Sequence, residues 1–275
     1  MNARMVNATF EDRNRTDFDP DANTNRFISK IPEYVAQGIR AFTFNLQGGT
    51  PGYEGAINSA FHADGNLRSD TMKRMQRVID ACDRNGCVAI LGCFYQRQDQ
   101  ILQDANAVRV GLLNVIDWLI HQKYRHVVLE IANEFNHGGF DHPIINTVKG
   151  EVKLIQILHQ AAPGLLISTS GLGDGKIPDE IAQASDFILI HFNGTPVNEI
   201  PERIQSLKRF NKPIVCIEDE KTGEEAAGAL DACVQNGASW GYMNLAVNQT
   251  FPFRFNGVQD DPIMYGKLKE ITMKH

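Results

Sequence analysis

The 275-residue sequence contains no apolar run near the roughly 20 residues that a membrane-spanning helix needs, which excludes a membrane span. It also lacks a surplus of basic residues, because 27 Lys and Arg stand against 33 Asp and Glu and leave a net charge of −6. Nucleic acid is therefore not expected as a partner. Positions 1–10 contain no apolar segment typical of a secretory signal, which leaves open a cytoplasmic protein or one whose signal has been removed.

Cysteine is scarce, and its spacing matches no common disulfide or zinc motif. The five cysteines are an odd number and form no Cys-x-x-Cys pair, which argues against a disulfide framework and a zinc ribbon. The histidines near the predicted strand ends (His62, His137, His142 and His191) show no His-x-His or His-Glu-x-x-His spacing. The sequence therefore predicts no metal site and no cofactor.

Short β-rich runs alternate along the chain with longer amphipathic segments. Segments 70–85 and 105–123, for example, carry apolar residues at the spacing of one helix face. The predicted strands are Met5–Phe10, Arg40–Leu46, Cys87–Phe94, His126–Ala132, Leu165–Ser170, Asp186–His191, Pro213–Glu218 and Ser239–Asn244. Several of these strands are nearly continuous apolar runs, as is typical of strands covered on both faces.

This alternation predicts parallel strands joined by right-handed crossovers. Eight strand–helix units use nearly all of the 275 residues, and no composition break or low-complexity tract indicates a second domain. The predicted fold class is therefore α/β, a (β/α)8 TIM barrel in which residues 1–275 form a single catalytic domain. An open α/β sheet with fewer strands is the alternative.

Barrels of this kind carry their chemistry at the carboxyl ends of the strands. Glu134 follows the fourth predicted strand and Glu218 ends the seventh, whereas no lysine at a strand end could serve a Schiff-base aldolase. Two carboxylates surrounded by amides and aromatic rings suit the cleavage of a glycosidic bond. The substrate-binding candidates at the other strand ends are Gln47, Tyr95, Asn133, His191, Asn193, Trp240 and Asn244.

Both glutamates of the fourth unit also have structural interpretations. Glu134 could be a helix-entry carboxylate that caps the next helix or pairs with an arginine at the rim. Glu130 lies inside the apolar run of the strand, so we expect it to have a buried ion-pair or hydrogen-bond partner.

Three consecutive carboxylates, at positions 218–220, compete for the role at the end of the seventh strand. Alternation along a strand places Glu218 and Glu220 on one side and Asp219 on the other. Glu218 is closest to the apolar strand and is favoured. Glu220, beside Lys221, is interpreted as a member of a surface ion pair.

These segments resemble a known group of enzymes. The run Val128-Leu-Glu-Ile-Ala-Asn-Glu134 resembles the strand-four Asn-Glu motif of clan A glycoside hydrolases, such as the family 5 group of cellulases and mannanases. Pro213–Glu218 is similar to their strand-seven segment, and 190–193 is similar to their strand-six His-Phe-Tyr segment. The resemblance implies that Glu134 is the acid/base and Glu218 the nucleophile.

The same resemblance implies that Asn133 binds the sugar 2-hydroxyl and that His191 lines the subsite near the acid/base. Some positions depart from the family pattern. Asn193 stands where the family often has a tyrosine, and Arg40 comes too early in its strand to match the family's strand-two arginine. Trp240 also falls early in its strand. These departures predict a divergent, family 5-like member.

The predicted function is retaining hydrolysis of β-linked bonds in an oligosaccharide or polysaccharide. Two alternatives remain open. One is a carbohydrate-binding barrel without catalytic activity, and the other is a barrel lyase or isomerase that uses the same glutamates for proton transfer. The sugar, the linkage and endo or exo action are not indicated by the sequence.

Overall fold

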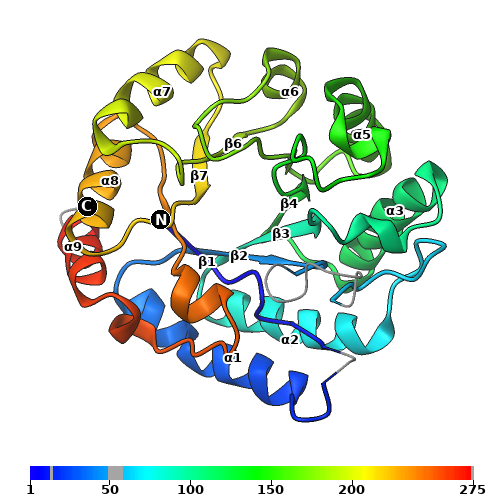
Figure 1. Cartoon of the computed structure of the whole chain (residues 1–275), viewed down its shortest axis with the longest axis horizontal. Coiled ribbons are helices and arrows are strands. Elements are labelled where there is room, and N and C mark those ends of the chain that lie inside the picture. Colours follow the sequence, from blue (N-terminus) through cyan, green and yellow to red (C-terminus); the bar gives the residue numbers. More distant parts are fainter. Residues whose placement is uncertain (13–14, 49–57, 274–275) are drawn as a thin grey trace.

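Parallel strands surrounded by helices form the centre of the molecule (Figure 1). The structure is a computed structural model that describes residues 1–12, 15–48 and 58–273. The strands in these ranges are β1 (Asn2–Arg4), β2 (Ala41–Asn45), β3 (Val88–Phe94), β4 (Val127–Ala132), β5 (Ile167–Ser168), β6 (Ile188–His191), β7 (Ile214–Glu218) and β8 (Gly241–Tyr242).

The strands close into a ring. Hydrogen-bonded pairing joins one sheet in the order β5-β4-β3-β2-β1-β8, and β6 pairs with β7 in a second sheet. Parallel bridges from Ser170 to Leu189 and from Val215 to Ser239 connect the two sheets at both junctions. The predicted (β/α)8 barrel is therefore confirmed.

The helices lie outside the strands (Figure 1). Several start at a polar side chain that binds free backbone N–H groups of the first turn, as Asp19, Asp104 and Thr147 do. Their apolar faces pack on the strands in one large core. The α-helices are α1 (Pro20–Ala36), α2 (Ser69–Arg84), α3 (Ala105–Gln122), α4 (Pro143–Asn146), α5 (Val148–Ala161), α6 (Asp179–Ala184), α7 (Ile200–Leu207), α8 (Gly223–Gln235) and α9 (Pro262–Thr272).

The first strand differs from the prediction. β1 is Asn2–Arg4, whereas the predicted strand Met5–Phe10 is a buried turn. Within that turn the Ala8 N–H donates to the Met5 carbonyl at 2.8 Å. Buried strands and buried turns both contain apolar residues, so the spacing of apolar residues alone did not distinguish the two. The correction places Arg4 at the carboxyl end of a barrel strand.

Two further predictions concern cysteine and the membrane. All five cysteines are buried free thiols, in line with the predicted absence of a disulfide framework. No helix within the described ranges combines the length and apolar character that crossing a bilayer requires.

Candidate active site

A pocket of about 250 Å³ opens at the carboxyl ends of the strands. Several of its lining residues were predicted from strand ends, but Met243, Leu245 and Gln249 were not, and Gln96 was not proposed as a substrate-binding residue. Gln96 directly follows Tyr95 beyond β3, so its position carried a signal. The lining residues are Tyr95, Gln96, Glu134, His137, Asn193, Glu218, Glu220, Met243, Leu245 and Gln249.

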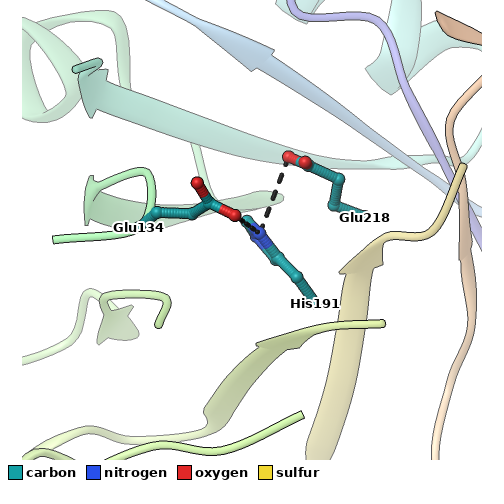
Figure 2. A group of neighbouring side chains, drawn as sticks. All are labelled: Glu134, His191 and Glu218. Atoms are coloured by element: carbon teal, nitrogen blue, oxygen red, sulfur yellow. Dashed lines mark hydrogen bonds and ion pairs between the residues drawn. The ribbon is translucent and has the colours of Figure 1, made fainter. Parts of the chain in front are cut away.

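Three side chains at or just beyond the ends of three strands meet beside this pocket, two of them in its lining. The Nδ1 atom of His191, which ends β6, lies 3.2 Å from Oε1 of Glu134 and 3.7 Å from Oε2 of Glu218. One oxygen of each carboxylate and one ring nitrogen all lie within 4.8 Å of one another. Figure 2 shows the imidazole facing both carboxylates. The two predicted catalytic glutamates are therefore neighbours in the folded chain.

Glu218 is held as an anion by the groups around it. Its Oε2 forms an ion pair with Nε of Arg4 at 2.8 Å, and its Oε1 accepts a hydrogen bond from Nδ2 of Asn193 at 2.5 Å. Burial on its own would raise the pKa of Glu218, but the charges of Arg4 and His191 and the bond from Asn193 together bring it below its ordinary value of 4.5. Glu218 is thus suited to be a nucleophile.

Arg4 is the main residue of this site that the sequence analysis missed. The family's arginine on the second strand was unmatched in the sequence, and Arg40, which comes too early to match it, donates to the carbonyls of Val35 and Ile39. Arg4 is fully buried and reaches Glu218 from β1. Because a buried arginine needs a charged partner, an arginine inside an apolar N-terminal run was the available signal.

His191 is fully buried between the two carboxylates. Burial alone would lower the pKa of the imidazole, but the negative charges of Glu218 and Glu134 raise it above its ordinary value of 6.5. The protonated ring is therefore stabilised where it bridges the two acids.

Asn133 lies beside the pair but is occupied by protein contacts. Its Oδ1 accepts from Nη2 of Arg4 at 2.6 Å, and its Nδ2 donates to Oε1 of Gln96 at 3.0 Å. The side chain is fully buried. Asn133 thus connects Arg4 to the pocket lining, and its predicted contact with a sugar stays a prediction.

Tyr95, which follows β3, is hydrogen-bonded through its backbone to the side chain of Gln47. Tyr95 lines the pocket, and the guanidinium of Arg4 lies 5.9 Å from the centre of its ring. Gln47 is fully buried, and its Oε1 accepts from the backbone N–H of Tyr95 at 3.0 Å. Gln47 therefore fixes Tyr95 and is not among the residues that line the pocket, so its predicted contact with a substrate stays a prediction.

Two other predicted binding residues pack around β8. Trp240 is 1% exposed and donates from Nε1 to Oδ2 of Asp219 at 2.9 Å. Asn244 donates to the hydroxyl of Tyr242 and to the carbonyl of Asp260, both at 2.9 Å. Neither side chain is part of the pocket lining. Both side chains pack within the protein, and their predicted contact with a substrate stays a prediction.

The carboxylates after Glu218 divide as strand alternation predicted. Glu220 is exposed and lines the pocket, whereas Asp219 is fully buried. Lys221, however, pairs with Asp219 at 2.9 Å and not with Glu220. The expected surface ion pair is therefore wrong, and Glu220 faces the pocket as an acidic side chain.

Glu130 is fully buried in β4, and the predicted buried hydrogen bond is confirmed. Its Oε1 accepts from the hydroxyl of Ser170 at 2.6 Å. Burial is the largest influence on this carboxyl and raises its pKa.

Glu134, His191 and Glu218 could also supply three ligand atoms to a metal ion. Sequence spacing did not predict this group, because its members come from three separate strands. However, Arg4 lies 2.8 Å from the Glu218 carboxylate, and its positive charge opposes a second cation at the same oxygens. With Arg4 beside Glu218, the two carboxyl groups are better suited to proton transfer than to binding a metal ion.

The comparisons with known proteins agree with this barrel. No family model and no curated protein matches the sequence. Among solved structures, the chain is similar to a family 5 broad-specificity endoglucanase from Ruminococcus flavefaciens, with a TM-score of 0.69, 12% identity and coverage of 99% of this chain and 95% of that one. It is also similar to a family 5 mannosidase from Rhizomucor miehei, with a TM-score of 0.67, 13% identity and coverage of 100% and 94%.

The architecture is thus that of an α/β barrel with acidic residues at the carboxyl ends of its strands. More specifically, the chain has the fold of the family 5 glycoside hydrolases, although its sequence is only 12% and 13% identical to these two. The family resemblance drawn from the Asn-Glu motif is confirmed at the level of the fold.

Proposed function

We propose that the protein is a retaining glycoside hydrolase that cleaves β-linked bonds in an oligosaccharide or polysaccharide. The proposal depends on one observation, that oxygens of Glu134 and Glu218 lie within 4.8 Å of each other. Retaining enzymes hold their two carboxyl groups about 5–5.5 Å apart, whereas inverting enzymes need about 6.5–9.5 Å to admit a water. The short separation favours direct attack by one carboxylate.

The charges around the two acids support a different role for each. Glu218, held as an anion by Arg4, attacks the anomeric carbon and forms a glycosyl ester. Glu134 gives its proton to the leaving oxygen in that step, and then removes a proton from the water that hydrolyses the ester. His191 Nδ1 lies against Oε1 of Glu134, so the transferred proton belongs on Oε2.

The pocket walls favour a neutral sugar. They carry amide and carboxylate groups, which pair with hydroxyls, and Tyr95 offers an aromatic ring. The similar solved structures are described as an endoglucanase and a mannosidase, so β-glucosides and β-mannosides are the first substrates to test.

Replacing the nucleophile tests this proposal. The Glu218→Gly variant should lose turnover of an activated aryl β-glycoside by roughly a thousandfold or more, because no glycosyl ester can form. Azide should restore product release by entering the vacated space, and the product should be the α-glycosyl azide.

The matched control is Glu224→Gln, which removes an exposed carboxylate at the start of α8, outside the pocket lining, and should keep turnover within a few-fold of the wild type. Near-normal turnover by Glu218→Gly, with no effect of azide, would show that Glu218 is not the nucleophile. Sugar binding without cleavage of any glycan would instead favour the carbohydrate-binding barrel.

The grouping of Glu134, His191 and Glu218 gives the lyase or isomerase alternative a specific test. A metal-assisted reaction of that kind would stop after chelation and resume when the metal is returned. A retaining hydrolase should keep its full rate after extended treatment with a chelator.

A further inference from the structure

We propose that Ser170, itself oriented by the buried carboxyl of Glu130, is a positioning residue that fixes the backbone of the general acid/base Glu134. The inference extends the proposed function to a residue that neither lines the pocket nor belongs to the Asn-Glu motif. It follows from a chain of short hydrogen bonds below the pocket.

Glu134 needs such support because of its backbone conformation. Its φ angle is +52°, in the left-handed region where the Cβ of a residue other than glycine is crowded. Ser170 contacts the backbone on both sides of this angle. Its Oγ accepts from the Glu134 N–H, and its carbonyl accepts from the Phe135 N–H, each at 2.9 Å.

Glu130 fixes the direction of the Ser170 hydroxyl. The hydroxyl lies 2.6 Å from Oε1 of Glu130 but 3.5 Å from the carbonyl of Ala132. A serine hydroxyl has one proton to donate, so the short bond to Glu130 leaves an oxygen lone pair free for the Glu134 N–H. Ser170 and Glu130 are both fully buried, so water does not compete for these bonds.

The consequence concerns the direction of the Glu134 carboxyl. Its Oε1 lies 3.2 Å from His191, and its remaining oxygen must face the glycosidic bond. A backbone free to leave the left-handed region would turn the carboxyl away from that bond. Proton donation to the leaving group would then become inefficient, whereas attack by Glu218 would be unaffected.

Leaving-group dependence separates this role from a general loss of stability. Alkyl and sugar leaving groups need a proton from Glu134, but a dinitrophenolate leaves without one. Ser170→Ala should therefore lower kcat/KM for an unactivated β-glycoside by about 10- to 100-fold. The dinitrophenyl β-glycoside should change by less than about threefold in the glycosylation step.

Thr169→Val is the matched control. Thr169 is also fully buried, and its hydroxyl donates to the carbonyl of Ala132 at 3.0 Å. This variant disturbs the same strand end without removing a bond to Glu134, so both substrates should change by equal factors. Equal losses on both substrates in Ser170→Ala would overturn the proposal.

Two variants of Glu130 test the second bond. Glu130→Gln keeps an acceptor oxygen for Ser170 and should retain the wild-type ratio of the two rates. Glu130→Leu removes the acceptor and should lower that ratio in the direction of Ser170→Ala. A wild-type ratio in Glu130→Leu would show that Glu130 does not orient Ser170.

Amide hydrogen exchange tests the positioning contact independently of any activity. Exchange of the Glu134 N–H should be at least about tenfold faster in Ser170→Ala than in the wild type or in Thr169→Val. Equal exchange in all three proteins would overturn the positioning role. If the wild type cleaves no glycoside, the proposed function fails, and hydrogen exchange still decides whether Ser170 holds Glu134.

Discussion

At the scale of single residues, Arg4 provides the positive charge that lies closest to Glu218. The two side chains form an ion pair at 2.8 Å, and both are buried. Arg4 also donates to Asn133 at 2.6 Å, so one guanidinium contacts the proposed nucleophile and the residue before the proposed acid/base. Such a pair is costly to break, because the remaining partner is left as an uncompensated buried charge.

Removing Arg4 should move the acid limb of the activity profile. Arg4 helps to hold the pKa of Glu218 below 4.5, so the wild type keeps an ionised nucleophile at lower pH than an ordinary glutamate would. In Arg4→Met the pKa of Glu218 should rise because the largest favourable charge is lost, and the acid limb of kcat/KM should move to higher pH with it. A pH–rate series on an activated glycoside measures this shift.

The contribution of the Arg4–Glu218 pair to the free energy of unfolding depends on pH, and Arg4→Met lacks this contribution. The Arg4–Glu218 pair stabilises the fold above the unfolded pKa of the glutamate and loses that contribution as the pH falls through the lowered folded value. Arg74→Met is the control for the pH–rate series. Arg74 also forms a buried ion pair, with Glu11 at a distance of 2.6 Å, but neither residue lines the pocket. An unmoved acid limb in Arg4→Met would contradict the role assigned to Arg4.

At the scale of elements, β8 shows that the barrel requires its neighbouring strands to approach one another closely. The strand has only two residues, pairs with β1 and is joined by bridges to β7. A Cβ at Gly241 would lie 2.5 Å from Oδ1 of Asn2 and 2.6 Å from the carbonyl oxygen of Cys216. The second of these atoms belongs to the backbone of β7, which cannot move without opening the barrel.

Gly241→Ala should therefore destabilise the fold by roughly 1–3 kcal/mol, as overpacking of a core does. The control is Gly266→Ala in α9, where a Cβ meets no atom within 4 Å. That change should stabilise the protein by up to about 1 kcal/mol, because alanine favours a helix. Denaturant unfolding followed by circular dichroism compares the two variants, and similar stabilities would contradict this account of β8.

The strands also show where sequence patterns succeed. The apolar runs of β2, β3, β4, β6 and β7 placed these strands correctly, because strands buried on both faces have a continuous signature. β1 was misplaced because its three residues are followed by a longer buried apolar turn. β5 and β8 are two residues each, shorter than their apolar runs, since hydrogen bonding to neighbours sets strand length.

At the scale of the whole molecule, charge limits the substrate. The net charge is −6, and the pocket wall adds Glu220 to the two proposed catalytic acids. A chain of uronic acids would therefore be repelled both at a distance and within the pocket. Neutral β-glycans carry no such penalty.

We expect neutral polymers to be cleaved faster than polyuronides of similar length. Added salt should raise any rate on a polyuronide, because it screens the repulsion, and should leave the rate on a neutral polymer unchanged. Rates on both polymers at about 0.01 M and 0.15 M salt measure the effect. A higher rate on the polyuronide at low salt would contradict the charge argument.

The sequence by itself determined the order of strands and helices, the barrel, and the positions of Glu134 and Glu218 at two strand ends. All of these follow from local patterns, because a few neighbouring residues are enough to indicate a strand buried on both faces and the point where it ends. Only the tertiary structure decided that Arg4 pairs with Glu218, that Lys221 pairs with Asp219, and that Trp240 faces the core. Those contacts depend on how ring closure juxtaposes separate strands, and no local pattern records that geometry.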